Sequence, residues 1–137
     1  MSRPEVPDEL VARVRAICLA LPEAHEHAAW TGTSWSIRKK TFAQVVHIED
    51  GWPPAFAKAA AAEGPFDVLT FRAPAAELDA YEHMGAPYFR PVWFPDIAGI
   101  AIDDATDWGE VAELIAESYC LLAPRRLAAS VRDAPPA

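Results

Sequence analysis

The densest group of cationic side chains in this sequence is Arg38-Lys39-Lys40. It stands between two segments with the alternating pattern of strands, where a hairpin would turn. Guanidinium and ammonium groups on a protruding turn can contact phosphate oxygens, and such contacts supply much of the affinity of proteins for nucleic acid. The alternative is a solvated turn whose charges discourage pairing at a sheet edge. We take these three residues as a candidate nucleic-acid-binding site.

The histidines offer a possible metal chemistry. His25-Glu26-His27 can place two imidazoles on one side of an extended segment, whereas His47 and His83 stand apart in the sequence. A zinc site requires a third and a fourth ligand, and the spacing identifies neither. We interpret the pair as polar loop histidines and expect no metal and no cofactor.

Carboxylates dominate residues 91–124, which hold seven of them and no Lys or Arg. Six follow the last predicted strand or lie on the last predicted helix: Asp103, Asp104, Asp107, Glu110, Glu113 and Glu117. They could attract a divalent cation. The alternative is structural, because carboxylates stabilise a helix N-terminus and the outer face of a helix must be polar.

Aromatic side chains are numerous and several fall in segments without a clear periodicity. Within residues 86–96, four of them stand among prolines. Together with two tryptophans they could line a cleft for a planar, aromatic small molecule. The alternative is packing against the core. The candidate ligand-binding residues are Trp30, Trp35, Tyr88, Phe89, Trp93 and Phe94.

No arrangement typical of catalysis stands out. Ser118 falls on the apolar stripe of a predicted helix and not on the strained turn of a nucleophile elbow. Cys18 and Cys120 are about 100 residues apart, lie in predicted helices and lack the spacing of metal or redox motifs, so we interpret them as core residues. We therefore name no catalytic residue and expect that the protein is not an enzyme.

Periodicity predicts an α+β protein. Two helices, at 8–21 and 107–122, each carry a single apolar stripe, so both should pack on the same face of a sheet. Asp107 and Glu110 have the spacing of a helix cap. The remaining predicted elements are strands at 33–38, 41–48, 66–72 and 97–102 and short helices at 55–62 and 74–84.

Composition limits the possible partners. The 137 residues suit one domain, which we place at residues 1–127, with a disordered tail at 128–137. The formal net charge of −8 repels a polyanion on average, so nucleic-acid binding would need a local basic patch. No apolar run reaches the ~20 residues of a membrane span, and residues 1–5 do not resemble a signal peptide. We expect a cytoplasmic protein with no membrane partner.

Three short motifs, in this order, resemble the MmcQ/YjbR family. They are Leu19-Ala20-Leu21-Pro22, Lys40-Thr41-Phe42-Ala43 and Glu117-Ser118-Tyr119-Cys120-Leu121-Leu122. The resemblance implies a CyaY-like fold, in which helices from both ends of the chain pack on an antiparallel sheet. It also implies the family's DNA-binding label but brings no catalytic residues. Where the family often has a basic stretch ending in His-Trp, this sequence has Pro95-Asp96-Ile97-Ala98.

Overall fold

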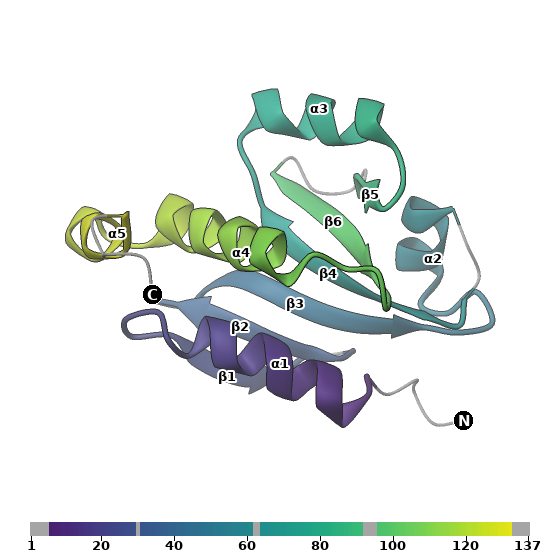
Figure 1. Cartoon of the computed structure of the whole chain (residues 1–137), viewed down its shortest axis with the longest axis horizontal. Helices are drawn as coiled ribbons and strands as arrows, with labels where there is room; N and C mark the ends of the chain where they lie inside the picture. The colour runs from purple at the N-terminus through teal and green to yellow at the C-terminus, as the bar shows by residue number, and fades with distance from the viewer. Residues whose placement is uncertain (1–5, 30, 62–63, 92–95, 133–137) are drawn as a thin grey trace.

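The computed structural model describes residues 6–29, 31–61, 64–91 and 96–132. Its elements are, in chain order, α1 (Asp8–Cys18), β1 (His25–Ala28), β2 (Thr33–Ile37), β3 (Lys40–Ile48), α2 (Pro54–Ala60), β4 (Phe66–Arg72), α3 (Ala75–Met84), β5 (Tyr88–Phe89), β6 (Ile97–Ile102), α4 (Trp108–Leu122) and α5 (Arg125–Arg132). Among the described residues, six strands form one antiparallel sheet in the order β1-β2-β3-β4-β6-β5 (Figure 1). The predicted α+β fold is confirmed.

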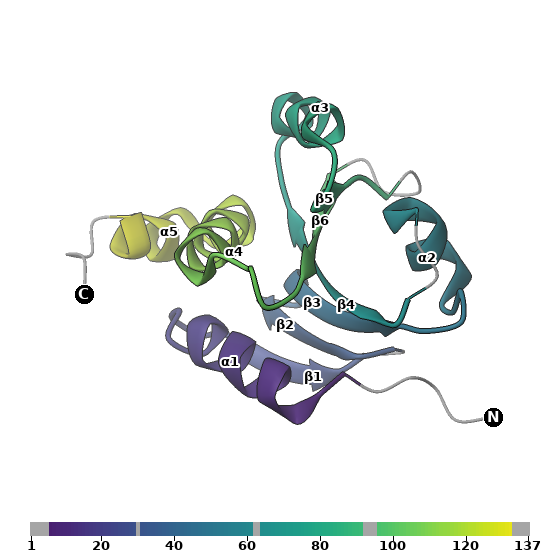
Figure 2. The same cartoon turned by 45° about the vertical axis from the view of Figure 1, so that its right-hand side comes forward.

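The first and the last predicted helix, α1 and α4, lie on the same face of the sheet, as we expected. Figures 1 and 2 show α1 and α4 on the same side, and the two helices contact each other. Val14 of α1 and Ile115 of α4 are fully buried in one core with Leu69 of β4. The Asp107 carboxylate caps α4 by accepting from the backbone N–H groups of Gly109 and Glu110, at 3.0 and 3.2 Å.

The opposite face of the sheet is covered only in part by the helices that the structure describes. Val46 and Val68 are paired on β3 and β4 and form a second, smaller core with residues of α2. Further along the same two strands, Gln44 pairs with Thr70 on this second face. Side chains alternate between faces along a strand, so the polar pair lies beside the small core and not beneath α1 and α4.

Strand β1 occupies residues that we expected to be a polar loop. It is an edge strand of four exposed residues, His25–Ala28, paired with β2. A strand exposed on both faces has no alternation of apolar and polar residues, which is why periodicity did not reveal it.

Strand β5 lies inside the predicted aromatic loop. Tyr88 pairs with Ile100 and Phe89 pairs with Gly99 on β6. The Phe89 ring packs where a side chain at residue 99 would stand, and a Cβ on Gly99 would overlap it. A two-residue strand is too short to show a period in sequence.

The two ends of the described chain also differ from the prediction. Helix α1 ends at Cys18, followed by a turn in which the Leu21 N–H donates to the Cys18 carbonyl at 3.1 Å. Residues preceding proline disfavour helical geometry, and Pro22 follows. Helix α5 continues to Arg132, so residues 128–132 of the expected disordered tail are helical, with Leu127 and Ala128 buried. No helix among the described residues is both long and apolar enough to cross a membrane, and the cytoplasmic location stays a prediction.

Candidate functional site

Ser118 joins helix α4 to two strands. Its side chain is fully buried; the hydroxyl donates to the Phe42 carbonyl at 2.6 Å and accepts from the Arg72 N–H at 2.7 Å. The register between β2 and β3 shifts beside these residues, so Phe42 and Ala43 both belong to the core under the helices. The Ser118 hydroxyl thus satisfies backbone groups where the β3–β4 ladder ends at the pair Ala43–Phe71.

Tyr119, the next residue, joins α4 to the turn that follows α1. Its hydroxyl donates to the Pro22 carbonyl at 2.6 Å, and its ring meets Phe42 edge to face at 5.5 Å. Burial raises the pKa of the Tyr119 phenol. The three motifs of the family resemblance therefore touch one another here. We call the contacts of Ser118 and Tyr119 with Pro22, Phe42 and Arg72 the junction.

A small pocket opens on the second face of the sheet, beside the junction. Its volume is about 180 Å³, and we call it the β3–β4 pocket. The Arg72 guanidinium at its rim is fixed: Nε donates to the Thr41 carbonyl at 3.1 Å, and Nη1 donates to both oxygens of Asp96 at 2.8 and 2.9 Å. The Gln44 amide donates to the Thr31 carbonyl at 2.9 Å. The other lining residues include Thr70, Phe56, Pro91 and Ile97.

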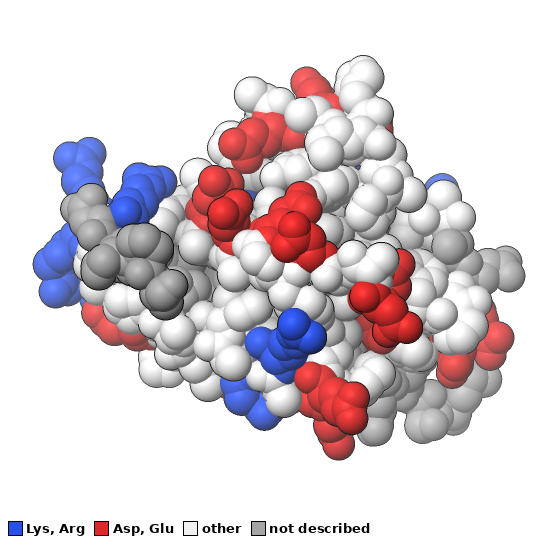
Figure 3. Space-filling model, in the orientation of Figure 1, with Lys and Arg blue, Asp and Glu red and all other residues white. Residues whose placement is uncertain are grey.

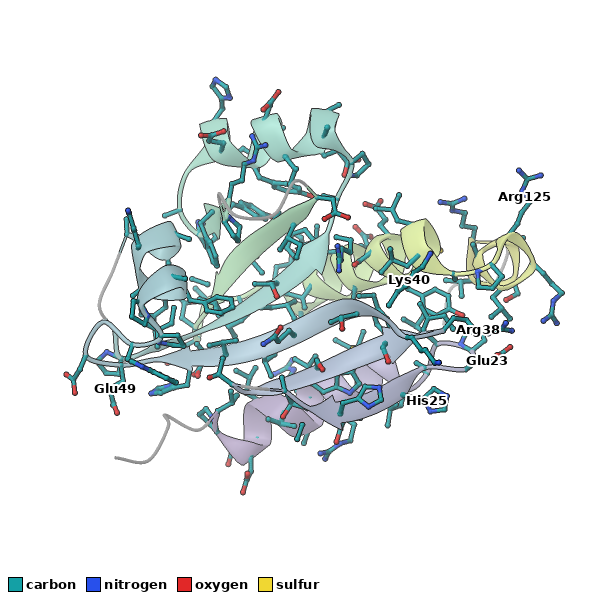
Figure 4. The ribbon with its side chains drawn as sticks, turned by 180° about the vertical axis from the view of Figure 1, so that it is seen from behind. Glu23, His25, Arg38, Lys40, Glu49 and Arg125 are labelled. Carbon is teal, nitrogen blue, oxygen red and sulfur yellow. The ribbon has the colours of Figure 1, made fainter. Side chains whose placement is uncertain are left out.

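A second pocket lies at the β2–β3 hairpin, and we call it the tip pocket. It has a volume of about 230 Å³ and is lined by Glu23, His25, His27, Ser36, Arg38 and Lys39. Figure 4 shows the labelled members at one end of the molecule, with Glu49 at the other. His27 Nε2 and Ser36 Oγ are 2.6 Å apart, a hydrogen bond whose direction depends on the imidazole tautomer.

The backbone at the hairpin tip adopts a left-handed conformation. Arg38 has φ of 50° and Lys39 has φ of 69°. Two-residue hairpin loops favour positive φ at both positions because it matches the strand twist, and for that reason they prefer Asn-Gly. Here two long basic residues adopt it instead, at a steric cost that Gly would avoid.

Helix α5 adds further cations beside the tip. Arg38 Nη2 lies 3.0 Å and Arg126 Nη2 lies 4.0 Å from the Glu23 carboxylate, so Glu23 lies between the hairpin and the helix. Figure 3 shows Lys and Arg gathered over α5, whereas Asp and Glu spread over α3 and α4. Half of the twelve Lys and Arg residues belong to the tip and α5, which we call the basic end: Arg38, Lys39, Lys40, Arg125, Arg126 and Arg132.

The aromatic residues of the predicted cleft are distributed over both faces. Trp35 is fully buried under α1 and α4, and its Nε1 donates to Glu26 at 3.0 Å. Tyr88 belongs to that same core, whereas Phe89 belongs to the smaller core on the other face. Tyr88 and Phe89 border an open hollow of about 510 Å³ that Trp35 does not line. Trp30, Trp93 and Phe94 lie outside the described residues.

The structure separates the histidines into one pair and two single residues. His25 and His27 share the tip pocket. His47 lies 2.8 Å from Asp67, and His83 Nδ1 lies 2.7 Å from the Asp79 carbonyl. Within the described part of the chain, no three His, Cys, Asp or Glu side chains are grouped as a metal site would need.

Sequence reasoning found the hairpin cations but missed their neighbours. Glu23 and Ser36 gave no motif, because a single acid before a strand and a serine within one are common. Arg132 fell in the expected disordered tail, and Arg125 and Arg126 stood just before it in a segment for which no element was predicted. Leu127 and Val131 are four residues apart, which is the spacing of neighbours on one face of a helix. This apolar spacing could have identified the helix from the sequence.

The fold and the site together define a small α+β protein built on one antiparallel sheet. The chain belongs to the YjbR family, because the family model described as YjbR matches residues 19–121. A crystal structure of a protein from Pseudomonas syringae is similar in fold, with a TM-score of 0.61 over 84% of this chain and 98% of that chain. Its 11% identity limits the likeness to the fold. No curated protein matches this chain.

Proposed function

We propose that this protein is a small nucleic-acid-binding protein that contacts phosphates through the basic end. The observation that carries the proposal is the meeting of the hairpin tip and α5, distant in sequence, around Glu23. A chain with a net charge of −8 here concentrates half of its cations at one end. A local basic surface is what a protein of acidic composition needs to approach a polyanion.

The side chains of the basic end are accessible to a ligand. The Arg38 side chain is 53% exposed and that of Arg126 is 78% exposed. Exposed ion pairs contribute little stability, so a phosphate can replace Glu23 as the partner of either arginine without unfolding its surroundings. The positive φ values at the tip agree with this role, since strained backbone is often kept at functional sites.

The acidic remainder of the molecule sets the strength of binding. Carboxylates on α3 and α4 repel a polyanion that approaches from other directions. We therefore expect weak binding that falls steeply with salt, because the attraction depends on a few exposed cations and is screened within about 10 Å at ordinary ionic strength.

The experiment is a titration of fluorescently labelled DNA, followed by anisotropy, over a range of salt concentrations. The variant R38A/K39A/K40A should weaken binding and lower the slope of log affinity against log salt by roughly 2–3, about one for each phosphate that these side chains neutralise. Unchanged affinity and slope in this variant would show that the wrong surface has been chosen.

A matched variant controls for the change in net charge. R13A/K58A/R90A removes three positive charges from outside the basic end; Arg13 lies over the Trp108 ring, and Arg90 pairs with Asp79. This variant should keep most of the affinity. Equal losses in both triple variants would mean that overall charge, and not the basic end, controls binding.

The proposal is a binding role without catalysis. DNA incubated with the protein and a divalent cation should keep its length on a denaturing gel. Cleavage that persists in protein purified to homogeneity would contradict this part of the proposal.

A second candidate is a small-molecule-binding protein that uses the aromatic loop 86–96. Tyr88 and Phe89 support it because they border the hollow of about 510 Å³ together with Pro87 and Arg90. An apolar anionic dye such as a naphthalene sulfonate is a suitable probe. Its fluorescence should rise on binding, and R90A should reduce the rise. A response that R90A leaves unchanged would count against the hollow as the binding site.

A further inference from the structure

The tip pocket and the β3–β4 pocket share a wall. Ser36 of β2 lines the first, Thr41 of β3 lines the second, and these two residues are register partners. Directly opposed residues of antiparallel strands have Cβ atoms about 5 Å apart and point to the same face. The two pockets are therefore neighbours on the second face of the sheet.

The tip pocket has the chemistry of a phosphate site. The Arg38 guanidinium, the Lys39 ammonium, the Ser36 hydroxyl and two imidazoles line one concavity. The Arg38 and Lys39 cations and the His25 imidazole can donate hydrogen bonds to an oxyanion, and donors that carry charge form the stronger bonds. His27 Nε2 and Ser36 Oγ share one hydrogen bond, so in the neutral state only one of these two groups has a hydrogen left for the anion. The pocket also includes the Glu23 carboxylate, which disfavours an anion and pairs with Arg38 in the free protein.

The β3–β4 pocket has the chemistry of a site for a flat ring with polar edges. Phe56, Pro91 and Ile97 supply apolar surface, while Gln44 and Thr70 supply polar groups. The Gln44 side chain is held by the bond from its amide to the Thr31 carbonyl, and its carboxamide oxygen can accept from a ring N–H. At the rim, Arg72 uses Nε and Nη1 within the protein, and Nη2 can donate to a ligand.

The separation of the two pockets fits one extended ligand. The tip pocket lies over β1 and β2 and the other over β3 and β4, about two strand spacings away, or ~10 Å. A phosphate, a sugar and a base in succession cover such a span. We propose that this face of the sheet binds a nucleoside phosphomonoester, free or at the end of a strand, with the phosphate in the tip pocket and the base in the β3–β4 pocket.

A phosphomonoester suits the tip pocket better than an internal phosphodiester. It carries a charge of about −1.5 to −2 at neutral pH, against −1 for a diester, and it has three free oxygens. Because of its greater charge, the phosphomonoester competes better than a diester with the Glu23 carboxylate for the Arg38 guanidinium. Glu23 is then a built-in competitor of the ligand, and neutralising it should strengthen binding.

This inference rests on the proposed function and names its ligand. The test starts from a short oligothymidylate without a terminal phosphate and compares it with the same strand carrying a 5′- or a 3′-phosphate. The control is an unphosphorylated strand one nucleotide longer, which has the same number of phosphates as the phosphorylated strand. One terminal phosphate should strengthen binding roughly tenfold relative to the longer strand. Equal affinities for the phosphorylated and the longer strands would overturn the inference, while loss of binding in R38A/K39A/K40A would still support the proposed function.

Free ligands distinguish the two sources of the phosphomonoester. Thymidine 5′-monophosphate should compete with the phosphorylated strand and should bind several-fold more tightly than deoxyribose 5-phosphate, which lacks the base. Thr70→Val should remove part of this difference and leave deoxyribose 5-phosphate binding unchanged.

Binding of the mononucleotide without binding of any strand would support the two pockets and overturn the proposed strand-binding function. Equal binding of the nucleotide and the sugar phosphate would overturn the assignment of the base pocket.

Two further variants test the tip pocket directly. E23Q should tighten binding of the phosphorylated strand several-fold, since Arg38 loses its competing carboxylate. The matched control E49Q changes the net charge equally at the other end of the molecule and should have little effect (Figure 4). H25Q/H27Q should reduce the preference for a terminal phosphate without weakening the unphosphorylated strand. Equal gains in E23Q and E49Q would reduce the effect to overall charge and contradict the role of Glu23.

Discussion

The junction and the hairpin tip are close in the chain, since Phe42 of β3 is only three residues after Lys39, but they differ in burial, charge and backbone conformation. At Phe42, buried groups are paired with Ser118 and Tyr119 across three elements. At Arg38 and Lys39 the backbone has positive φ and the chain is exposed. A rigid, satisfied core next to a strained and charged turn is the arrangement expected when the first holds the second in place.

The difference also explains what the family motifs do. The residues that carry the resemblance are concentrated at the junction, where Ser118 and Tyr119 make hydrogen bonds that shape the sheet. Ser118 and Tyr119 maintain the fold from fully buried positions and offer no reactive group to solvent. The charged groups that can meet a ligand lie at the neighbouring tip and on α5. In this molecule the hydrogen bonds of the junction maintain the fold, while most of the proposed ligand contacts come from side chains around it; Lys40 belongs both to a family motif and to the basic end.

The largest expected effect comes from breaking the junction. Ser118→Ala leaves the Phe42 carbonyl and the Arg72 N–H without their partner in a buried place, so it should destabilise the fold by about 2–4 kcal/mol, the usual cost of two unsatisfied groups. Urea denaturation followed by circular dichroism measures this. The exposed change Glu113→Ala is the control and should cost little. A loss below about 0.5 kcal/mol in Ser118→Ala would remove the contrast between the two regions.

A smaller loss should follow from removing one hydroxyl. Tyr119→Phe keeps the ring against Phe42 and deletes the hydrogen bond to the Pro22 carbonyl. We expect a loss of about 1–2 kcal/mol in the same denaturation experiment, because a part-buried acceptor loses its donor. Stability equal to the parent protein would mean that the ring, and not the hydrogen bond, joins α1 to α4.

The hairpin tip should respond in the opposite direction. R38N/K39G supplies the residues that positive φ favours, so it should stabilise the protein by roughly 0.5–1 kcal/mol while it weakens nucleic-acid binding. R38A/K39A is the matched control: it removes the same charges, keeps the unfavourable backbone and should lose binding without gaining stability. If R38N/K39G is destabilised, the tip is not strained and the comparison fails.

The smallest effect concerns the ion pair that joins Arg15 of α1 to Glu26 of β1. The Arg15 guanidinium donates to Glu26 at 2.7 Å and lowers the pKa of that carboxyl. A carboxyl with a lowered folded-state pKa contributes stability above its unfolded-state pKa and loses it as the pH falls through the folded-state value. Glu26→Gln keeps an acceptor for Trp35 but should lose a few tenths of a kcal/mol at neutral pH, since the pair is partly exposed. The two proteins should converge in stability in acid, and a constant difference down to low pH would contradict this.

Much of the fold follows from the sequence because its long elements have clear periods. The strands Phe66–Arg72 and Ile97–Ile102 have the predicted bounds, and α4 begins at its predicted cap. The elements that were missed are short or exposed: β1 has no buried residue and β5 has two residues. Such segments become strands through pairing with β2 and β6, which is a tertiary effect that local pattern does not encode.

The site was accessible to sequence reasoning only in part. Arg38 to Lys40 could be found because they are adjacent in the chain. Glu23, Ser36 and Arg126 reach the same place from the turn after α1, from β2 and from α5, and only the folded chain brings them together. The aromatic hypothesis shows the reverse: residues of similar chemistry were grouped by type, but Trp35 and Phe89 point to opposite faces of the sheet.

On the face that Figure 3 shows, Lys and Arg gather over α5 and Asp and Glu lie over α3 and α4, so positive and negative charge are partly separated along the molecule. Near a nucleic-acid strand, which is negatively charged along its length, a protein with this charge distribution is rotated by the electric field even though its net charge is repelled. Its acidic surfaces are turned away and its basic end is turned inward, so the rotational search is shortened even though the total charge is repulsive. Encounters in other orientations end quickly. In the proposed binding, this orientation brings the hairpin tip to the strand first, next to the face of the sheet on which both pockets lie.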